Sequence, residues 1–209
     1  MTRTDAIAKR TLDIAVSAVG LAVFWPVIAL ATLLAARDTG ASGLFRQQRI
    51  GRLGMPFTLY KIRTMRAEAG TTVTTRGDAR ITPLGAQLRR LKIDELPQLW
   101  NVLIGDMSLV GPRPDMPGYA DALEGEAREI LILRPGITGP ASLKYRDEET
   151  LLAAADDPQV YNDQVIWPDK VRLNLEYARN VSLTRDLRYL LATLHILDPG
   201  LEQEAACDG

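Results

Sequence analysis

The stretch of residues 14–36 reads IAVSAVGLAVFWPVIALATLLAA, and it decides the fold class of this chain. It runs for 23 residues without a charged side chain. As an α-helix, at ~1.5 Å per residue, it would be about 34 Å long, which is enough to cross the hydrocarbon core of a bilayer. The sequence therefore predicts an N-terminal membrane segment.

Two features of this segment argue against a simple single-pass anchor. Pro26 lies near its middle, where a proline removes a backbone hydrogen bond and kinks a helix. Both flanks are basic, and a chain that enters, bends and leaves on the same face keeps both on the cytoplasmic side. The flanking cations are Lys9, Arg10, Arg37, Arg46, Arg49 and Arg52. The residues alone favour a re-entrant helix-break-helix, and a spanning helix or a signal peptide remains open.

The overall composition indicates one compact domain with a well-formed core. The chain has 209 residues, 46% of them hydrophobic, which argues against disorder. The single cysteine, Cys207, excludes an internal disulfide framework, and the single histidine, His195, excludes a zinc site with several histidine ligands.

Charge is divided unevenly along the chain. Residues 1–93 carry 15 Lys and Arg against 5 Asp and Glu, whereas residues 94–209 carry 10 against 21. A basic half can bind nucleic acid, an anionic membrane surface or a phosphorylated substrate. Because this half surrounds the apolar segment and no nucleic-acid recognition motif is present, membrane lipids are the predicted partner and nucleic acid is not.

The rest of the chain predicts a mainly α-helical fold with a minor β element. Residues 57–62 follow a Gly/Pro turn and suggest a short strand. Residues 67–82 have no apolar period and suggest a surface loop, after which Pro83 stands at the first position of a helix. Further amphipathic helices are expected over residues 115–133, 146–155, 158–179 and 183–197. The last has a leucine stripe that suits either the core or the membrane interface.

Adjacent carboxylates in basic surroundings are the candidate chemical centre. Asp94 and Glu95 follow Arg89, Arg90 and Lys92 and precede a proline, so that both can converge on one ligand at a helix start. A carboxylate beside bound phosphates, with cations to neutralise them, can act as a nucleophile in phosphoryl transfer. The alternative is a pair of acids that stabilises a helix N-terminus, and spacing alone leaves both interpretations open.

Several long motifs occur one after another along the chain. After the apolar segment with its central proline come FRQQRIG at residues 45–51 and FTLYKIRTM at residues 57–65. They are followed by IDELPQLWNVLIGDMSLVGPRP at residues 93–114, RPGITG at residues 134–139 and YARNVSLTRDLRYL at residues 177–190. KRTLD at residues 9–13 opens the series. These motifs and their order closely resemble the bacterial sugar transferase family, the monotopic phosphoglycosyl transferases.

The resemblance implies a transferase of glycoconjugate or polysaccharide biosynthesis at the cytoplasmic face of the bacterial plasma membrane. It would move a sugar 1-phosphate from a UDP-sugar to a polyprenyl phosphate, usually undecaprenyl phosphate, and release UMP. The implied layout is a re-entrant membrane hairpin over residues 1–40 with its kink at Pro26, a catalytic domain over residues 41–200 and a loose tail over residues 201–209. The donor sugar, the pathway and a homodimer are left open.

The resemblance also implies roles for individual residues. Asp94 would be the nucleophile that forms a covalent phosphosugar intermediate, and Glu95 would bind metal or handle a proton. Mg²⁺ is the implied metal, and its preference for carboxylates, phosphates and water agrees with a site at this pair. The expected phosphate contacts are Arg89, Lys61 and Arg113, followed by Arg63 and Arg134.

The chain departs from the family pattern at two places. Trp25 precedes Pro26 where the family commonly has serine, so a hydroxyl that could satisfy the freed carbonyl is missing. Residues 140–149 read PASLKYRDEE in place of the family's Leu-Ala-Gln or Leu-Trp-Gln and Gly-Arg, which predicts a difference in sugar preference. Two other functions compete with transfer to a lipid: hydrolysis of a UDP-sugar, and a non-catalytic membrane scaffold for glycan assembly.

Overall fold

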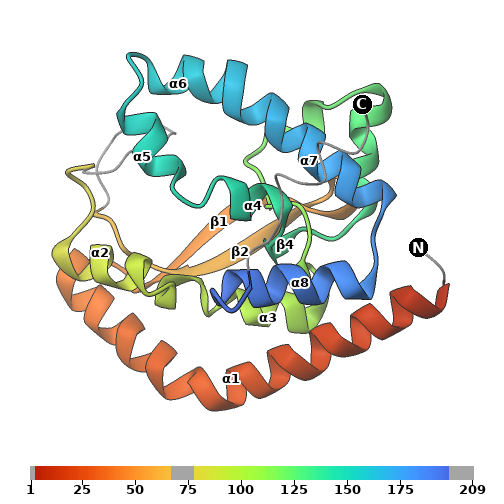
Figure 1. Cartoon of the computed structure of the whole chain (residues 1–209). Helices are drawn as coiled ribbons and strands as arrows, with labels where there is room; N and C mark the ends of the chain where they lie inside the picture. Colours follow the sequence, from red (N-terminus) through yellow and green to blue (C-terminus); the bar gives the residue numbers. More distant parts are fainter. Residues whose placement is uncertain (1–2, 67–77, 198–209) are drawn as a thin grey trace.

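The computed structural model describes residues 3–66 and 78–197, so the predicted tail and most of the predicted loop lie outside the described residues. Its first element is the long helix α1 (Arg3–Thr39), which contains Pro26. Figure 1 shows α1 bending near its middle while it runs beneath the rest of the molecule. Since Pro26 cannot donate a backbone hydrogen bond, it accounts for the bend.

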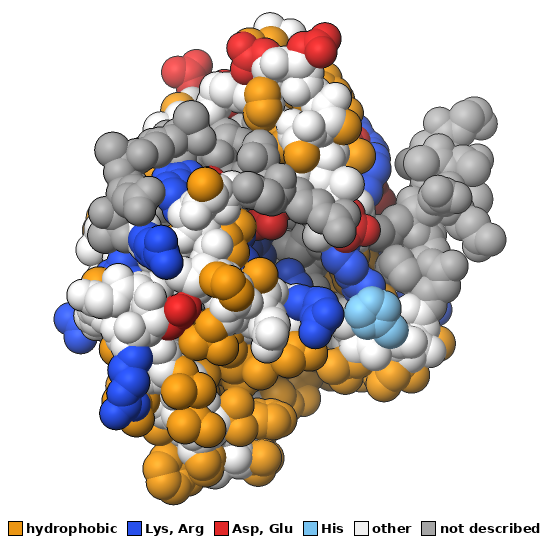
Figure 2. Space-filling model, turned by 90° about the vertical axis from the view of Figure 1, so that its left-hand side faces the viewer, with side chains coloured by type: hydrophobic (Ala, Val, Ile, Leu, Met, Phe, Trp, Pro, Cys, Tyr) orange, Lys and Arg blue, Asp and Glu red, His pale blue; other side chains and the backbone are white. Residues whose placement is uncertain are grey.

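The apolar face of α1 is largely uncovered. Val19, Val23 and Trp25 are each more than 60% exposed. Figure 2 shows the resulting apolar surface at the bottom of the molecule. Among the described residues, α1 is the one helix long and apolar enough to cross a membrane.

Buried polar contacts tie the N-terminal arm of α1 to the domain above it. Asp13 is 3% exposed and accepts hydrogen bonds from Ser108 Oγ at 3.1 Å and from the Leu109 amide at 2.9 Å. Lys9 donates to the Val110 carbonyl and forms an ion pair with Asp186, which is 2% exposed. The charged flank of the membrane segment is therefore used to fix the helix to the protein.

Replacing Lys9 with methionine should destabilise the fold by about 3–5 kcal/mol, because it leaves the Asp186 carboxylate buried without its cation. Thermal unfolding in detergent measures the loss. The matched control is Lys144→Met, which breaks the more exposed pair with Asp169 and should cost less than about 1 kcal/mol. Equal losses in the two variants would contradict the prediction.

The β structure consists of two small sheets. Strands β1 (Leu44–Ile50) and β2 (Pro56–Ile62) form an antiparallel hairpin around the short helix η1 (Arg52–Gly54), which confirms the predicted strand. Strands β3 (Ser108–Val110) and β4 (Gly136–Thr138) form a short parallel pair. Because β3 leads directly into GPRP and β4 lies within RPGITG, this pair places the two motifs side by side.

The remaining elements are helical. They are α2 (Pro83–Arg90), η2 (Ile93–Glu95), α3 (Gln98–Ile104), η3 (Ala120–Ala122), η4 (Gly125–Ile132), α4 (Pro140–Lys144), α5 (Glu148–Ala153), α6 (Pro158–Tyr161), the π-helical η5 (Asn162–Ile166), α7 (Trp167–Arg179) and α8 (Leu183–Thr193). Thr82 caps α2 by accepting from the Gly85 amide, so the predicted helix start is confirmed. Figure 1 places α2, α3 and α8 directly above α1 and α5 to α7 on the far side of the hairpin.

The α-helix predicted over residues 115–133 is wrong. This stretch holds two separate 3₁₀ helices, η3 and η4. Gly118 and Gly125 adopt left-handed backbone angles, with φ of +98° and +56°, which interrupt a right-handed helix. The predicted helix over residues 158–179 is confirmed as the continuous series α6, η5 and α7.

Candidate active site

The backbone at the end of α2 places the two candidate carboxylates inside the molecule. Lys92 has a left-handed conformation with φ +57°, which is costly for a residue with a side chain. It turns the chain so that η2 leads directly into α3. Asp94 is 7% exposed, and the Glu95 side chain is 12% exposed. Because both side chains are largely buried, the pair does not fit the alternative of exposed acids that only stabilise a helix N-terminus.

Two cations from distant parts of the chain hold Glu95. Its Oε1 accepts from Lys61 Nζ at 3.3 Å and from Arg113 Nη2 at 3.0 Å. Burial alone would raise the pKa of Glu95, but the charges of Arg113 and Lys61 outweigh it and hold that pKa well below its usual value. Glu95 is thus a stable carboxylate anion.

Interlocked turns place Arg113 beside Glu95. The Gly111 amide donates to the Thr138 carbonyl at 2.9 Å, and the Gly136 amide donates to the Pro112 carbonyl at 2.7 Å. A Cβ atom on Gly136 would lie 2.1 Å from the Gly111 nitrogen, so only glycine fits at this crossing. The glycines of the two motifs therefore serve to bring their backbones together.

Asp94 has a different environment from its neighbour. Its Oδ1 is buried and has no hydrogen-bond partner among the described residues. Burial, followed by the negative charge of Glu95, raises the pKa of Asp94 to about 6. The carboxylate is therefore more basic than usual, and it lacks the cation clamp that neutralises Glu95.

Gln98 is a site residue that the sequence reasoning missed. It is 2% exposed, and its buried Nε2 has no partner among the described residues. It lies four positions after Asp94, at the start of α3, and in a continuous helix this spacing places two side chains on the same face. That spacing was the available signal, since an amide one turn from a carboxylate can orient it.

Arg89 lies at the edge of the same site. Its Nη1 donates to Glu149 Oε1 at 2.7 Å, and its Nε donates to Thr64 Oγ1 at 3.0 Å. Its charge is close enough to lower the pKa of Asp94. Glu149 belongs to the segment that departs from the family pattern, so this segment reaches a predicted phosphate-binding side chain.

The structure does not bring Arg63 and Arg134 into this cluster. Arg63 Nε donates to the Ser42 carbonyl at 2.7 Å, and its guanidinium lies over the Phe45 ring. Arg134 Nε donates to the Gly105 carbonyl at 2.8 Å, at the far end of α3 from Asp94. Their roles as phosphate contacts remain predictions.

A second charged group adjoins Arg113 and was also missed. Lys170 Nζ donates to both carboxylate oxygens of Glu148, at 2.7 and 2.8 Å. Asp115 lies within the electrostatic reach of Lys170, Arg49 and Arg113. These residues come from four separate parts of the chain, and no local spacing in the sequence links them.

Asp115 makes the stability of the protein depend on pH. Burial raises its pKa from 3.8 to about 6 against the pull of nearby cations. The folded protein therefore binds this proton more tightly than the unfolded chain, and the contribution to stability is lost as the pH rises through this range. Asp115→Asn should be more stable than wild type at pH 7 and similar to it near pH 4. Thermal unfolding across this range tests the prediction, and a constant difference would contradict it.

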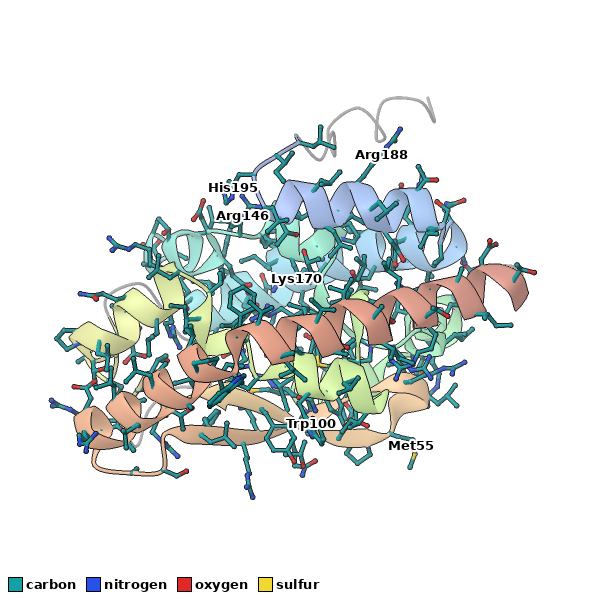
Figure 3. The ribbon with its side chains drawn as sticks, turned by 90° about the horizontal axis from the view of Figure 1, so that it is seen from below. Met55, Trp100, Arg146, Lys170, Arg188 and His195 are labelled. Carbon is teal, nitrogen blue, oxygen red and sulfur yellow. The ribbon has the colours of Figure 1, made fainter. Side chains whose placement is uncertain are left out.

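The side chains of Lys61 and Arg113 are partly exposed, to 20% and 41%. Figure 2, which views the side of α2 and α5, shows a hollow with Lys and Arg side chains in it, above the apolar surface. Beside it lies a cavity lined by side chains that include Lys144, Arg146 and His195. Arg146 Nη1 and His195 Nε2 are 2.6 Å apart, and Figure 3 shows the two side chains together. The histidine thus joins α8 to the segment before α5.

Comparison with known proteins agrees with this arrangement. A Bacillus subtilis (strain 168) protein, provisionally named as an undecaprenyl-phosphate N-acetylgalactosaminyl 1-phosphate transferase, is 43% identical over 67% of this chain and 79% of its own length. The UDP-glucose:undecaprenyl-phosphate glucose-1-phosphate transferase of Caulobacter vibrioides is 37% identical over 90% of this chain and 68% of its own length.

A third relative is longer than this chain. The UDP-N-acetylgalactosamine-undecaprenyl-phosphate N-acetylgalactosaminephosphotransferase of Aeromonas hydrophila is 32% identical over 93% of this chain, but over 44% of its own length. The family model described as bacterial sugar transferase matches residues 4–198, which include the bent helix and every residue of the candidate site. This chain belongs to the bacterial sugar transferase family.

Proposed function

We propose that this protein transfers a sugar 1-phosphate from a UDP-sugar to undecaprenyl phosphate and releases UMP, through a covalent intermediate on Asp94. The observation that carries the proposal is the contrast between the paired carboxylates. Glu95 is neutralised by Lys61 and Arg113, whereas Asp94 keeps an unpartnered Oδ1 and a raised pKa of about 6. A basic carboxylate without a counter-ion is the better nucleophile of the two.

The reaction balances in two displacements. A carboxylate oxygen of Asp94 attacks the phosphorus that bears the sugar, and the bond from that phosphorus to the bridging oxygen breaks, so that UMP leaves with this oxygen. A phosphate oxygen of the polyprenyl acceptor then attacks the same phosphorus and restores the Asp94 carboxylate. The product is a polyprenyl diphosphate sugar.

Lys61 and Arg113 can bind Glu95 and donor phosphates at the same time. The guanidinium of Arg113 has five N–H donors and the ammonium of Lys61 has three. Glu95 accepts one hydrogen bond from each group, so both have donors left for phosphate. Arg89 can add a third cation, although its pair with Glu149 must then be shared or released. These groups would stabilise the charge that develops on the transferred phosphoryl group.

Mg²⁺ fits the oxygen atoms of this site. No group of three or more acidic, histidine or cysteine side chains gathers in the described ranges, which argues against a metal held by the protein alone. Mg²⁺ is commonly bound by one or two carboxylates together with substrate phosphates and water. The unpartnered oxygen of Asp94 and the neighbouring Glu95 would hold it, and it would neutralise charge on the donor's diphosphate.

The bent, exposed helix α1 supports a location at the cytoplasmic face of the plasma membrane. A re-entrant arrangement would bury Val19, Val23 and Trp25 in lipid while both ends of α1 stay on one side. The site above α1 would then lie within reach of a phosphate on a membrane-embedded polyprenyl chain.

Intact-protein mass and UMP release test this function together. Enzyme held in nanodiscs is mixed with a panel of UDP-sugars and Mg²⁺, with and without polyprenyl phosphate. We expect a mass increase of one sugar phosphate without the acceptor, and sustained UMP release only with it. Sustained release without the acceptor would indicate a hydrolase. Neither an adduct nor release with any donor would favour a scaffold.

A further inference from the structure

Three arginines gather at the C-terminal end of α3, away from Asp94. Arg10 of α1 donates to the Val102 carbonyl at 2.7 Å and to the Leu103 carbonyl at 2.9 Å. Arg134 donates to the carbonyl of Gly105, the residue that caps the same helix end. Arg52 donates to the carbonyl of Ile132, two residues from Arg134.

In the described part of the chain, this group of arginines has no direct carboxylate partner. The hydrogen bonds of the nearby acids go to other groups: Asp13 accepts from Ser108 and Leu109, and Asp106 accepts from Asn101, while the charge of Asp13 still acts on Arg134. Burial, followed by the charges of Arg52 and Arg10, lowers the pKa of Arg134 and outweighs the opposite effect of the Asp13 charge.

Hydrogen bonds to carbonyl groups alone do not balance the positive charge of three arginines. The dipole of α3 favours positive charge at this end, but it amounts to about half an elementary charge. Each guanidinium also has N–H donors beyond those used on carbonyls. An anion with several acceptor oxygens, such as a phosphate, would satisfy both the charge and the donors.

Exposed apolar side chains lie close in sequence to Arg52 and Arg134, and to the α3 carbonyls that bind Arg10. Leu53 follows Arg52 and is 65% exposed, and Ile132, whose carbonyl binds Arg52, is 56% exposed. Trp100 and Ile104 are half exposed and lie one turn apart on α3. Figure 3, seen from the side of α1, shows Trp100 and Met55 along the same edge. Cations within an apolar rim that carries a tryptophan are typical of a membrane interface.

The position of the group separates it from the reaction. Gly105 lies eleven residues beyond Asp94 along η2 and α3, or about 16 Å at the rise of an α-helix. A phosphate held by Arg134 at this helix end is therefore too far away to be attacked by Asp94. Its ligand must be something other than the donor diphosphate in its reacting position.

We propose that Arg10, Arg52 and Arg134 form a binding site for the phosphate headgroup of an anionic membrane lipid, distinct from the Asp94 site. The inference rests on the membrane location in the proposed function. The bound lipid would fix the N-terminal arm of α1 and the end of α3 at the level of the headgroups. Its phosphate would accept hydrogen bonds from the three guanidinium groups, and its acyl chains would lie beside Leu53, Ile104 and Trp100.

Native mass spectrometry of the full chain in a neutral detergent tests the site by direct binding. The protein is titrated with phosphatidylglycerol, phosphatidylcholine, inorganic phosphate and polyprenyl phosphate. We expect phosphatidylglycerol to bind most tightly. Arg52→Gln should weaken it about fivefold, and Arg52→Gln with Arg134→Gln about twentyfold or more. Arg188→Gln, which removes an exposed arginine on the opposite edge of Figure 3, is the matched control and should bind like wild type.

Several outcomes would overturn the proposal. Equal lipid affinity in wild type and both arginine variants would show that the group binds no headgroup. Inorganic phosphate binding as tightly as the lipid would make it a simple anion site, and stronger binding of polyprenyl phosphate would assign it to the acceptor. Arg52 is exposed, so the single variant tests the site even if the double variant unfolds. Because binding is measured without turnover, this result is independent of whether Asp94 forms an adduct.

Discussion

Asp94→Asn should abolish the covalent phosphosugar adduct and lower lipid-dependent UMP release by about 10³-fold or more, because an amide oxygen cannot replace the attacking carboxylate. Intact mass after mixing with UDP-sugar and Mg²⁺ measures the first effect, and UMP release measures the second. Turnover that survives the substitution would mean that the acceptor phosphate attacks the donor directly. Asp94 would then serve the metal or act as a base.

The same substitution should stabilise the folded protein, which separates lost chemistry from lost structure. Burial and Glu95 raise the pKa of Asp94 from 3.8 to about 6, so its ionised form is costly in the folded state at neutral pH. Removing that charge should raise the free energy of unfolding by up to about 3 kcal/mol. We expect a higher midpoint of thermal unfolding at pH 7 in metal-free buffer. An inactive variant that also melts at a lower temperature would indicate damage to the fold.

The bent helix and the carboxylate pair could be predicted because their signals are local. Pro26 within a long uncharged run predicts a kinked apolar helix, whatever the rest of the chain does. The adjacency of Asp94 and Glu95, followed by Pro97, places both carboxylates at a helix start. The spacing could not tell the two acids apart, because their difference depends on Lys61 and Arg113, which arrive from other parts of the fold.

The roles of the cations could not be predicted from local sequence alone. Motif position assigned five cations to phosphate, but tertiary structure divides them between different surroundings. Lys61 and Arg113 meet at Glu95, Arg89 borders the site, and Arg63 and Arg134 bind main-chain carbonyls elsewhere. The parallel pair of β3 and β4 that places Arg113 was equally hidden, since three-residue strands are too short to show alternation.

The site therefore separates the roles of two chemically similar acids by controlling their neighbours. The cations at Glu95 hold one negative charge beside Asp94, and this charge helps to keep the Asp94 carboxylate basic. In the proposed function, the same cations retain N–H donors for the phosphates of the substrate. Arg113 is central to both effects, because its permanently charged guanidinium pairs with Glu95 and has further N–H donors.

Arg113→Met should lower kcat/KM for the donor by about 10²–10³-fold, because it removes a preorganised donor from the transferring phosphoryl group. Arg113→Lys keeps the charge but loses the planar fork, so we expect a smaller loss with a raised KM. Arg63→Met is the matched comparison. Arg63 is held at the Ser42 carbonyl and the Phe45 ring, so its loss should cost less than about tenfold. Steady-state UMP release with varied UDP-sugar measures all three variants. Equal losses for Arg113→Met and Arg63→Met would contradict the prediction. They would show that both arginines bind the donor, so that the separate positions of Arg63 and Arg113 in the structure hold only for the substrate-free enzyme.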